Sequence, residues 1–375
     1  MKILWINPSF LDYRVPVYQK LNQLTEGNFY ILYSIKRVPK RINIKIKAAI
    51  GENAIGFEGE SVFEFGKNEM ANKHLRIPYT YGLYKQITTV NADIIITEGF
   101  FQWTPQALRY AIRHHKPIFI DYERTKWTER ECPQWRTLYR KIVDRFITGY
   151  LVNGSLTKEY LESIGVKKNK IYIAGMSADS TGLANAVNNY LHYTNSTKSP
   201  GLIYCYSGQM IPRKGVDYLL KAWLKHIKQH PQDLLMLVGG GELLERFQKE
   251  YGSVNSIQIK GSVDYDEIYK YYAISNVFVI PTLEDNWSLV VPEAMACSLP
   301  IACSIYNGCY PELVHEGENG VLFNPLDEQS LLRALDIFHR VDLSAYGQKS
   351  KEIEAKYNSD IVANNILKAC ELSLK

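Results

Sequence analysis

The sequence predicts an α/β protein of two domains, each built on a parallel sheet that helices cover. A chain of 375 residues is long enough for two domains of ordinary size, and 46% hydrophobic with 22% charged residues is the composition of a globular protein. Short apolar strands at 93–97 and 117–121 alternate with helical segments such as 102–115. Parallel strands need such helical crossovers, so the alternation favours this fold class.

The stretch 277–302 carries the strongest local pattern. Residues 277–280 read VFVI, a short buried strand, and a polar loop over 283–287 leads into the helical sequence LVVPEAMAC. Ser288 is the expected N-cap of that helix, and its free backbone amides, at Leu289 and Val290, would then face the carboxyl end of the strand. A helix start at the end of a parallel strand is an anion site, which suits a phosphate.

Two acids bracket this turn. Asp285 precedes the predicted helix and Glu293 lies within it, with Glu284 beside the first acid. A carboxylate at a helix start can accept two hydrogen bonds from a ribose diol, and one in the preceding loop can accept bonds from sugar hydroxyls. The alternative is that Glu293 only stabilises the helix start and Asp285 is a turn residue.

The sequence around these acids resembles a known signature. EDNWSLVVPEAMACSLPIA is similar to the nucleotide-sugar signature of the retaining glycosyltransferases of family 4, the glycosyl transferases group 1. That pattern has an acid, seven residues, a glutamate and then Ala-Met-Ala-Cys-Gly-Leu-Pro-Val. This chain departs from it at Asp285, where Glu is usual, and at Ser298, where Gly is usual. Asp is shorter by one methylene, so Glu284 is an alternative for the sugar contact.

The resemblance implies the GT-B fold, in which two Rossmann-like domains face each other across a cleft. Residues 1–193 would bind the acceptor and 194–358 the nucleotide sugar, with a polar linker at 193–200. A last helix at 359–375 would cross back to the N-terminal domain.

The resemblance also implies which residues bind the donor. In the family an Arg after Gly, and a later Lys, hold the diphosphate, and here Gly208, Gln209 and Lys214 occupy those positions. Gln209 lacks the charge, and Arg213 is the candidate to supply it. The remaining implied donor residues, in glycine-rich and backbone contacts and around the two acids, are Gly239, Gly240, Gly241, Val263, Glu284, Asp285, Ser288, Leu289, Val290 and Glu293.

On the acceptor side the resemblance points to two loops of the first domain. Tyr13 and Arg14 follow the first strand, where the family's usual Gly-Gly pair is absent, and Glu123 and Arg124 follow the strand at 117–121. Glu123 would orient an acceptor hydroxyl. The alternatives are that Arg14 is a surface cation at a helix start and Glu123 a salt-bridged surface acid.

The implied function is that of a retaining hexosyltransferase. It would move a sugar from a nucleoside diphosphate sugar to a hydroxyl of a glycan or lipid-linked acceptor, in synthesis of a cell-surface polysaccharide such as lipopolysaccharide. Lys214, Arg213, Asp285 and Glu123 would carry the reaction without a metal or cofactor. Gln209, Asp285 and the missing Gly-Gly pair leave open a catalytically weak, nucleotide-sugar-binding partner subunit.

Composition sets further bounds. The six cysteines form no Cys-x-x-Cys pair, which disfavours a zinc or disulfide framework and fits the cytoplasm. His226 and His230 are four apart, but without an evident third ligand they are expected on a solvated helix face. No apolar run approaches the length of a membrane span. The net charge is only +5, and nucleic-acid binding signatures are absent.

The basic residues cluster at 36–47, and two interpretations of this segment stay open. It is either a solvated loop or a patch that faces anionic lipid headgroups or a lipid-diphosphate acceptor at the inner membrane surface.

Overall fold

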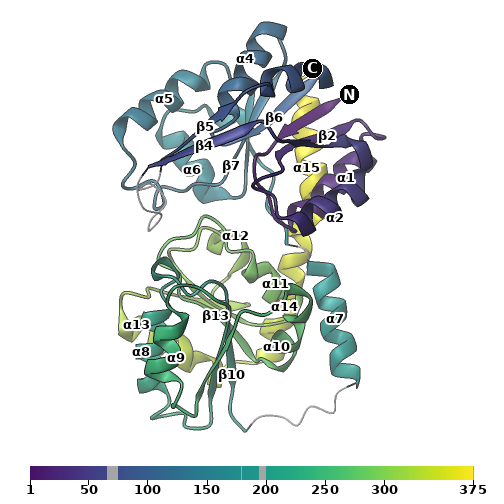
Figure 1. The fold of residues 1–375 in the computed structure, drawn as a ribbon. Helices are drawn as coiled ribbons and strands as arrows, with labels where there is room; N and C mark the ends of the chain where they lie inside the picture. The colour runs from purple at the N-terminus through teal and green to yellow at the C-terminus, as the bar shows by residue number, and fades with distance from the viewer. Residues whose placement is uncertain (66–74, 179, 194–199, 375) are drawn as a thin grey trace. The chain divides into compact units, whose positions relative to one another are not determined.

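The computed structural model describes residues 1–65, 75–178, 180–193 and 200–374. The chain divides into two compact units (Figure 1). The first unit consists of Met1–Ser177 and Tyr357–Lys375, and the second of Ala178–Lys356.

The first unit is built on a sheet in which every strand pairing is parallel, in the order β3-β2-β1-β6-β7-β8-β9. Its strands are β1 (Ile3–Ile6), β2 (Phe29–Ser34), β3 (Ala54–Phe57), β6 (Ile94–Glu98), β7 (Ile118–Tyr122), β8 (Gly149–Val152) and β9 (Ile171–Ile173). The hairpin of β4 (Glu60–Phe65) and β5 (Leu75–Thr80) is antiparallel. The chain reverses direction across the sheet between β1 and β6, which makes their shared carboxyl edge the switch point where α/β folds bind ligands.

Helices cover both faces of this sheet, and they are α1 (Arg14–Leu24), α2 (Lys40–Ile50), α3 (Leu83–Val90), α4 (Thr104–His114), α5 (Gln134–Asp144), α6 (Ser155–Ser163) and α15 (Ser359–Leu372). The 3-10 turns are η1 (Gly51–Asn53) and η2 (Lys168–Lys170). The last helix, α15, lies beside α1 (Figure 1), where Asp360 pairs with Lys20 at 3.1 Å.

From Lys40 on, the basic segment is a helix rather than the loop that one interpretation expected, and only Lys36 and Arg37 lie in the turn before it. Ile42, Ile46 and Ile50 recur at every fourth residue of α2 and are buried, while Lys40 and Lys47 are exposed. The apolar stripe at this spacing fixes one face of the helix on the core and leaves its basic residues outside.

The second unit repeats the architecture with the strand order β12-β11-β10-β13-β14-β15, again all parallel. The strands are β10 (Ile203–Ser207), β11 (Leu234–Val238), β12 (Ile257–Gly261), β13 (Val277–Ile280), β14 (Ile301–Ser304) and β15 (Gly320–Phe323). This order is that of a Rossmann fold, with its switch point between β10 and β13. The parallel sheets predicted from the alternation of strands and helices are confirmed.

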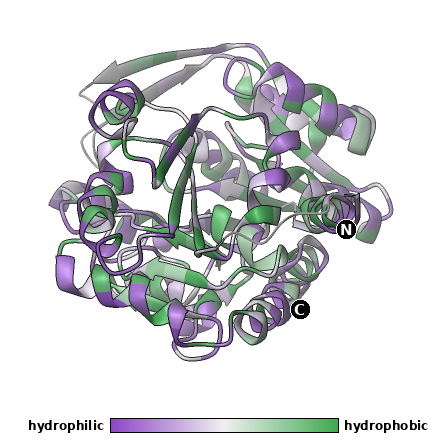
Figure 2. Cartoon of the chain, turned by 90° about the horizontal axis from the view of Figure 1, so that it is seen from below, coloured by the Kyte–Doolittle hydropathy of each residue, from purple (hydrophilic) through white to green (hydrophobic). Residues whose placement is uncertain are grey.

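The helices of the second unit are α7 (Ser180–Tyr193), α8 (Val216–His226), α9 (Leu244–Tyr251), α10 (Tyr269–Ile274), α11 (Val290–Ala296), α12 (Tyr310–Leu313), α13 (Glu328–Asp336) and α14 (Leu343–Glu354). The 3-10 turns are η3 (Pro212–Lys214), η4 (Tyr265–Glu267), η5 (Ile337–His339) and η6 (Ala355–Tyr357). Helical ribbons in Figure 2 carry both hydrophobic and hydrophilic residues, as expected for helices with one face on a sheet.

The boundary between the units lies after Ser177 rather than after residue 193 as predicted. The reason is α7, which packs on α10 and α11 of the second unit, with the rings of Tyr190 and Tyr269 in edge contact at 5.8 Å. Residues 194–199 of the predicted linker lie outside the described residues.

Candidate functional site

Four loops of the second unit leave the carboxyl ends of adjacent strands around the switch point. They are residues 208–214 after β10, 239–241 after β11, 262–263 after β12 and 281–289 after β13. All the residues predicted from the donor signature outside α11 lie on these loops. The fold therefore brings together at one edge of the sheet positions that are far apart in the sequence.

An ion pair joins two of these loops. The Lys214 ammonium donates to Oδ2 of Asp285, and the Ser288 hydroxyl donates to the same oxygen at 2.6 Å. Both charged side chains are nearly buried, with 12% and 13% exposed. Burial alone would raise the pKa of Asp285, but the charge of Lys214 and the hydrogen bonds from Lys214 and Ser288 outweigh it, so its pKa is lowered. Asp285 is therefore a carboxylate at neutral pH.

The backbone of Arg213 ties the same two loops together. Its carbonyl oxygen accepts hydrogen bonds from the Leu283 amide at 2.8 Å and from the Thr282 hydroxyl at 3.1 Å. Its guanidinium donates to the carbonyl oxygen of Glu284 at 3.3 Å. Next to it, Gly215 adopts a φ of +69°, and a Cβ there would lie 2.1 Å from the Pro281 carbonyl oxygen. The position requires glycine, and this close approach places Lys214 against the loop after β13.

The glycine turn after β11 packs on the loop after β10. A Cβ at Gly239, where φ is +136°, would lie 1.9 Å from the carbonyl oxygen of Gly208, and one at Gly241 would lie 2.5 Å from that of Met210. The Met210 amide donates to the Gly240 carbonyl at 2.7 Å. The absence of side chains at this turn thus serves backbone-to-backbone packing at the switch point. The side chain of Gln209 is exposed beside it.

The helix after β13 differs from its prediction at its start. It begins at Val290, and Ser288 is not a side-chain cap, because its hydroxyl donates to Asp285 and its amide to Asn307 Oδ1 at 3.3 Å. Glu293 lies in the first turn, as predicted. Its two carboxylate oxygens accept hydrogen bonds from the hydroxyls of Tyr265 at 3.1 Å and Tyr272 at 3.3 Å.

The switch point of the first unit holds a different cluster. Arg14, at the start of α1, is 4% exposed, so the alternative that it is a surface cation is wrong. Its Nη2 donates to Oδ2 of Asp121 and, at 3.0 Å, to Oε1 of Glu123, and it lies 3.9 Å from Oε1 of Glu98. The acids stand at the carboxyl ends of β6 and β7. Tyr13 also faces this cluster, since its ring stacks on the guanidinium with 5.7 Å to the centroid.

Glu98 and Asp121 are functional candidates that the sequence patterns did not single out, although Asp121 ends the strand predicted at 117–121 and Glu98 directly follows the one predicted at 93–97. The Glu98 carboxylate accepts hydrogen bonds from the Trp5 ring at 3.1 Å and from the Asn7 amide at 2.7 Å. Burial and the negative charge of Asp121 raise the pKa of Glu98 well above its usual range, despite the nearby Arg14.

The other predicted residue on this loop, Arg124, interacts away from Arg14. Its Nε lies 3.2 Å from Oε1 of Glu129, a buried acid that also accepts a 2.8 Å hydrogen bond from Arg140. Glu98, Asp121 and Glu123 have oxygens close enough to share a cation. The guanidinium of Arg14 contacts all three and supplies that positive charge.

Residues 201–339 match the family model of the glycosyl transferases group 1, which confirms the resemblance to that group. The match covers the four donor-side loops described above.

Curated relatives include glycosyltransferases of no established substrate. One from Haemophilus influenzae is 31% identical over 134 residues, which are 35% of this chain and 37% of the relative. One from Methanocaldococcus jannaschii is 26% identical over 193 residues, 50% of this chain and 52% of the relative. The chain thus spans about a third to a half of the length of these relatives.

Solved structures extend the likeness to the whole chain. Alr3699/HepE of Anabaena, in complex with UDP, aligns with a TM-score of 0.74 at 15% identity and full coverage of both chains. Sucrose-phosphate synthase of Thermosynechococcus elongatus aligns with a TM-score of 0.67 at 17% identity over 98% of each chain. At this identity the likeness shows the fold, and the predicted GT-B fold class is confirmed.

Among the described residues, no helix is both long enough and apolar enough to cross a membrane.

Proposed function

We propose that this chain, with its group 1 region over residues 201–339, is a glycosyltransferase that uses a nucleoside diphosphate sugar as donor. The observation that carries the proposal is the Lys214–Asp285–Ser288 cluster at the switch point of the second sheet. A cation held at the carboxyl ends of parallel strands beside a glycine-rich turn suits a diphosphate. The UDP bound by Alr3699/HepE, a protein of the same fold, agrees with a donor of this class.

Lys214 is the residue we assign to the diphosphate. Transfer of the sugar leaves negative charge on the departing diphosphate, and a fixed cation in a nearly dry site stabilises such charge without reorganising at the moment of reaction. Arg213 adds a second positive charge on the same turn, and Gln209 contributes neutral N–H donors where the family has Arg. Hydrogen bonds from a neutral donor are about half as strong as those from a charged one.

The two acids have separate proposed roles. Glu293 accepts hydrogen bonds from the hydroxyls of the ribose. Its carboxylate already accepts hydrogen bonds from two tyrosine hydroxyls in this unit, so it lies where hydroxyl donors fit. Asp285 fixes the Lys214 ammonium and stays ionised in a position to accept a sugar hydroxyl. Glu284, only 4% exposed on the same loop, is the alternative acceptor for that hydroxyl.

We assign the acceptor to the first unit and the reaction to the retaining class, as the family implies. Glu123 would accept a hydrogen bond from the hydroxyl of a glycan or lipid-linked acceptor. Nη2 of Arg14 donates to Oε1 of Glu123 at 3.0 Å and so holds that carboxylate in place. Tyr13 and Arg124 flank these two residues in the sequence. A polysaccharide as the end product follows from the family expectation.

The test of the donor site is the substitution Lys214→Ala. Turnover is measured with a panel of UDP-, GDP-, ADP- and dTDP-sugars as donors. The release of the nucleoside diphosphate is the readout. Removing one preorganised donor to a developing negative charge costs about 100- to 1,000-fold in kcat, so a loss of that order is expected. Lys349→Ala is the matched control, since Lys349 pairs with Glu318 at 3.1 Å on the surface of the same unit. Equal turnover by the two variants would contradict the assignment.

The same panel separates the enzyme from a catalytically weak partner subunit. Gln209 and Asp285, which depart from the family pattern, motivate that second candidate. A nucleotide that raises the melting temperature, with neither hydrolysis nor transfer to lipid extracts, would favour the subunit. Slow release of diphosphate from one donor would favour the enzyme and identify the base.

We also propose that the exposed face of α2 lies on an anionic membrane surface. Lys40, Ile44 and Lys47 are exposed on this helix, and Ile44 has 63% of its surface accessible. Basic residues around an exposed apolar side chain are typical of interfacial helices. The double substitution Lys40→Glu, Lys47→Glu should weaken co-sedimentation with vesicles of anionic lipid and leave neutral vesicles unaffected. Unchanged sedimentation would remove the membrane assignment.

A further inference from the structure

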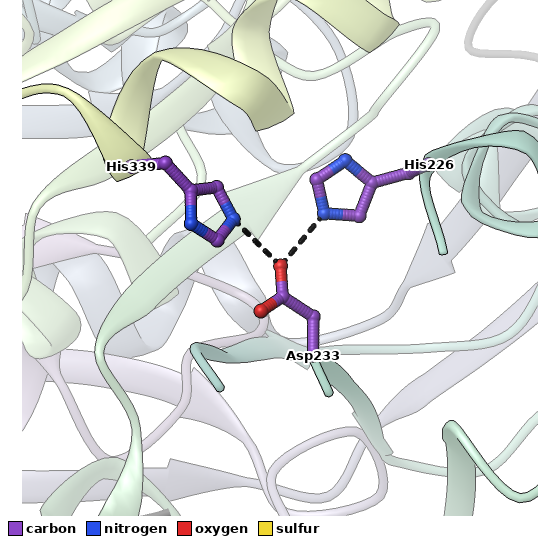
Figure 3. A group of neighbouring side chains, drawn as sticks. All are labelled: His226, Asp233 and His339. Carbon is purple, nitrogen blue, oxygen red and sulfur yellow. Dashed lines mark hydrogen bonds and ion pairs between the residues drawn. The ribbon is translucent and has the colours of Figure 1, made fainter. Parts of the chain in front are cut away.

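A second cluster of titratable side chains lies in the second unit, away from the donor loops. It joins His226, the last residue of α8, Asp233, the residue before β11, and His339, the last residue of η5. Figure 3 shows the two imidazoles converging on one carboxylate. Nε2 of each ring lies 2.8 Å from the same atom, Oδ2 of Asp233. The expectation that His226 lies on a solvated helix face is therefore wrong: it is 3% exposed, and the fold groups it with Asp233 and His339 rather than with His230.

The cluster is buried on one side and reachable on the other. His226 and Asp233 are each 3% exposed, whereas the side chain of His339 is 24% exposed. Asp233 and His339 line a cavity of about 710 Å³. The other lining residues include Leu202 and Asn276, which immediately precede β10 and β13. The cavity thus lies at the amino ends of the strands, at the edge opposite the donor loops.

The two nitrogen-to-oxygen separations are close to those of metal ligands. All three ligand atoms lie within 4.8 Å of one another. Imidazole nitrogens and carboxylate oxygens bind Zn²⁺ at about 2.0–2.2 Å, which puts neighbouring ligands about 3 Å apart in octahedral and about 3.4 Å apart in tetrahedral geometry. A nitrogen-to-oxygen distance of 2.8 Å needs only a few tenths of an ångström of expansion. One ion would replace both protons that the oxygen now shares.

The surroundings hold the ligands in place. The Leu202 amide donates to the other oxygen of Asp233 at 2.8 Å, which orients the carboxylate. The ring of His230 stacks on that of His339, with centroids 3.7 Å apart and planes within 10°, and its Nε2 lies 2.9 Å from Asp336. Such outer contacts fix the ligands of metal sites and tune their affinity.

We propose that His226, Asp233 and His339 form a binding site for a divalent transition-metal ion of the Zn²⁺ class. Two imidazoles and one carboxylate are a ligand set for Zn²⁺, and the remaining positions would be taken by water from the cavity. The ion would link α8, the start of β11 and η5. Its position at the amino ends of the strands makes this site independent of the proposed transfer reaction.

The test uses the full chain without a histidine tag, stripped with a chelator and titrated with Zn²⁺ against a chromophoric chelator. One zinc ion per chain and a higher melting temperature are expected. His339→Ala is the main variant, because His339 is the most exposed ligand and its loss is the least damaging to folding. Even outer-shell substitutions cost about 10- to 100-fold in metal affinity, so a loss of at least about 100-fold is expected here. His315→Ala, at an exposed histidine of the same unit, should bind zinc as the unaltered chain does.

Two further measurements make the outcome decisive. Asp233→Asn should also weaken zinc binding, with folding checked by circular dichroism. Co²⁺ in place of Zn²⁺ should give d–d absorption bands that His339→Ala abolishes. Zinc binding that is equal in the unaltered chain and in His339→Ala would overturn the proposal. So would the absence of binding at micromolar zinc in a folded unaltered chain, which would leave a hydrogen-bonded structural cluster.

Discussion

The two switch points of this molecule share a topology but differ in their balance of charge. In each unit a cation from the segment after the first strand of the sheet meets a carboxylate at the end of a neighbouring strand. In the first unit Arg14 meets Glu98, Asp121 and Glu123, so three acids surround one guanidinium. In the second unit, within the part of the chain that the structure describes, Lys214 pairs with one acid, Asp285.

The difference shows how one fold can suit unlike ligands. Excess acid at the first switch point favours hydroxyl donors and protons, and burial together with the charge of Asp121 raises the pKa of Glu98. At the second, the pairing of Lys214 lowers the pKa of Asp285, and Arg213 on the same turn adds positive charge. A region that attracts anions suits the donor proposed for the second unit, and a region that accepts hydrogen bonds suits the acceptor proposed for the first.

The largest effect is expected at the switch point whose cation is the more deeply buried, since the side chain of Arg14 is 5% exposed and that of Lys214 is 12% exposed. Arg14→Met keeps an unbranched side chain but removes the guanidinium, which lies 5.3 Å from the centroid of the Trp5 ring, and leaves the buried acids without a counter-charge. Removing one partner of a buried pair costs about 3–5 kcal/mol, so the first unit should lose stability of that order. Urea unfolding, with hydrogen exchange followed in β1 and β6, measures the loss.

Two variants control this prediction. Arg41→Met removes an arginine whose side chain is 62% exposed and pairs with Asp12, and it should cost little. Arg14→Lys retains the charge and should recover part of the loss. If Arg14→Met were no worse than Arg41→Met, the first switch point would not depend on its cation, and the comparison of the two units would fail.

Sequence patterns predicted the sheets of both units and the second switch point well, but the first switch point poorly. Lys214, Asp285 and Glu293 lie in short sequence motifs with fixed spacing, so their proposed chemistry can be recognised from the sequence. Arg14 and Asp121 are 107 residues apart, and only the pairing of β1, β6 and β7 makes them neighbours. Long-range pairing leaves no periodicity in the chain.

The errors have physical causes of the same kind. The first domain was expected to extend to residue 193 because of the polar stretch that follows, yet the packing of the ring residues of α7 assigns this helix to the second unit. Serine is a residue type preferred at N-caps, but the hydroxyl of Ser288 donates instead to the carboxylate of Asp285, which is a stronger acceptor. His339 lies 106 residues from Asp233 in the sequence, so the convergence of His226 and His339 on Asp233 is visible only in the fold.

An intermediate effect is expected from Asp285→Asn, which leaves Lys214 without its carboxylate. Hydrogen bonds to charged groups contribute about 1.5–3 kcal/mol, and the second unit should lose stability in that range. The folded pKa of Asp285 is lowered, so its contribution is present above the ordinary aspartate pKa and is lost only as the pH falls through the folded value. The difference between variant and unaltered chain, measured by urea unfolding, should therefore be the same at pH 7 and pH 5.

Asp217→Asn is the control for that measurement, because Asp217 pairs with Arg246 at the surface with 31% of its side chain exposed. It should change stability little at either pH. A difference for Asp285→Asn that grows between pH 7 and pH 5 would mean that the pKa of Asp285 is raised rather than lowered, and the contrast between the two switch points would lose its electrostatic basis.

The smallest effect, and the one of opposite sign, is expected from Glu98→Gln. The folded pKa of Glu98 is raised, so the folded chain binds more protons than the unfolded chain above the ordinary glutamate pKa, and its stability falls as the pH rises through that window. Gln keeps an oxygen for the hydrogen bonds from Trp5 and Asn7 and has no charge to bury. Relative to the unaltered chain, the variant should therefore gain on the order of 1 kcal/mol between pH 5 and pH 8. Melting temperatures at both pH values test this, with Asp360→Asn as the control, since Asp360 has a side chain 62% exposed. A relative stability that stays constant or falls with pH would place Glu98 among ordinary ionised acids, and the two switch points would then differ only in the number of their carboxylates.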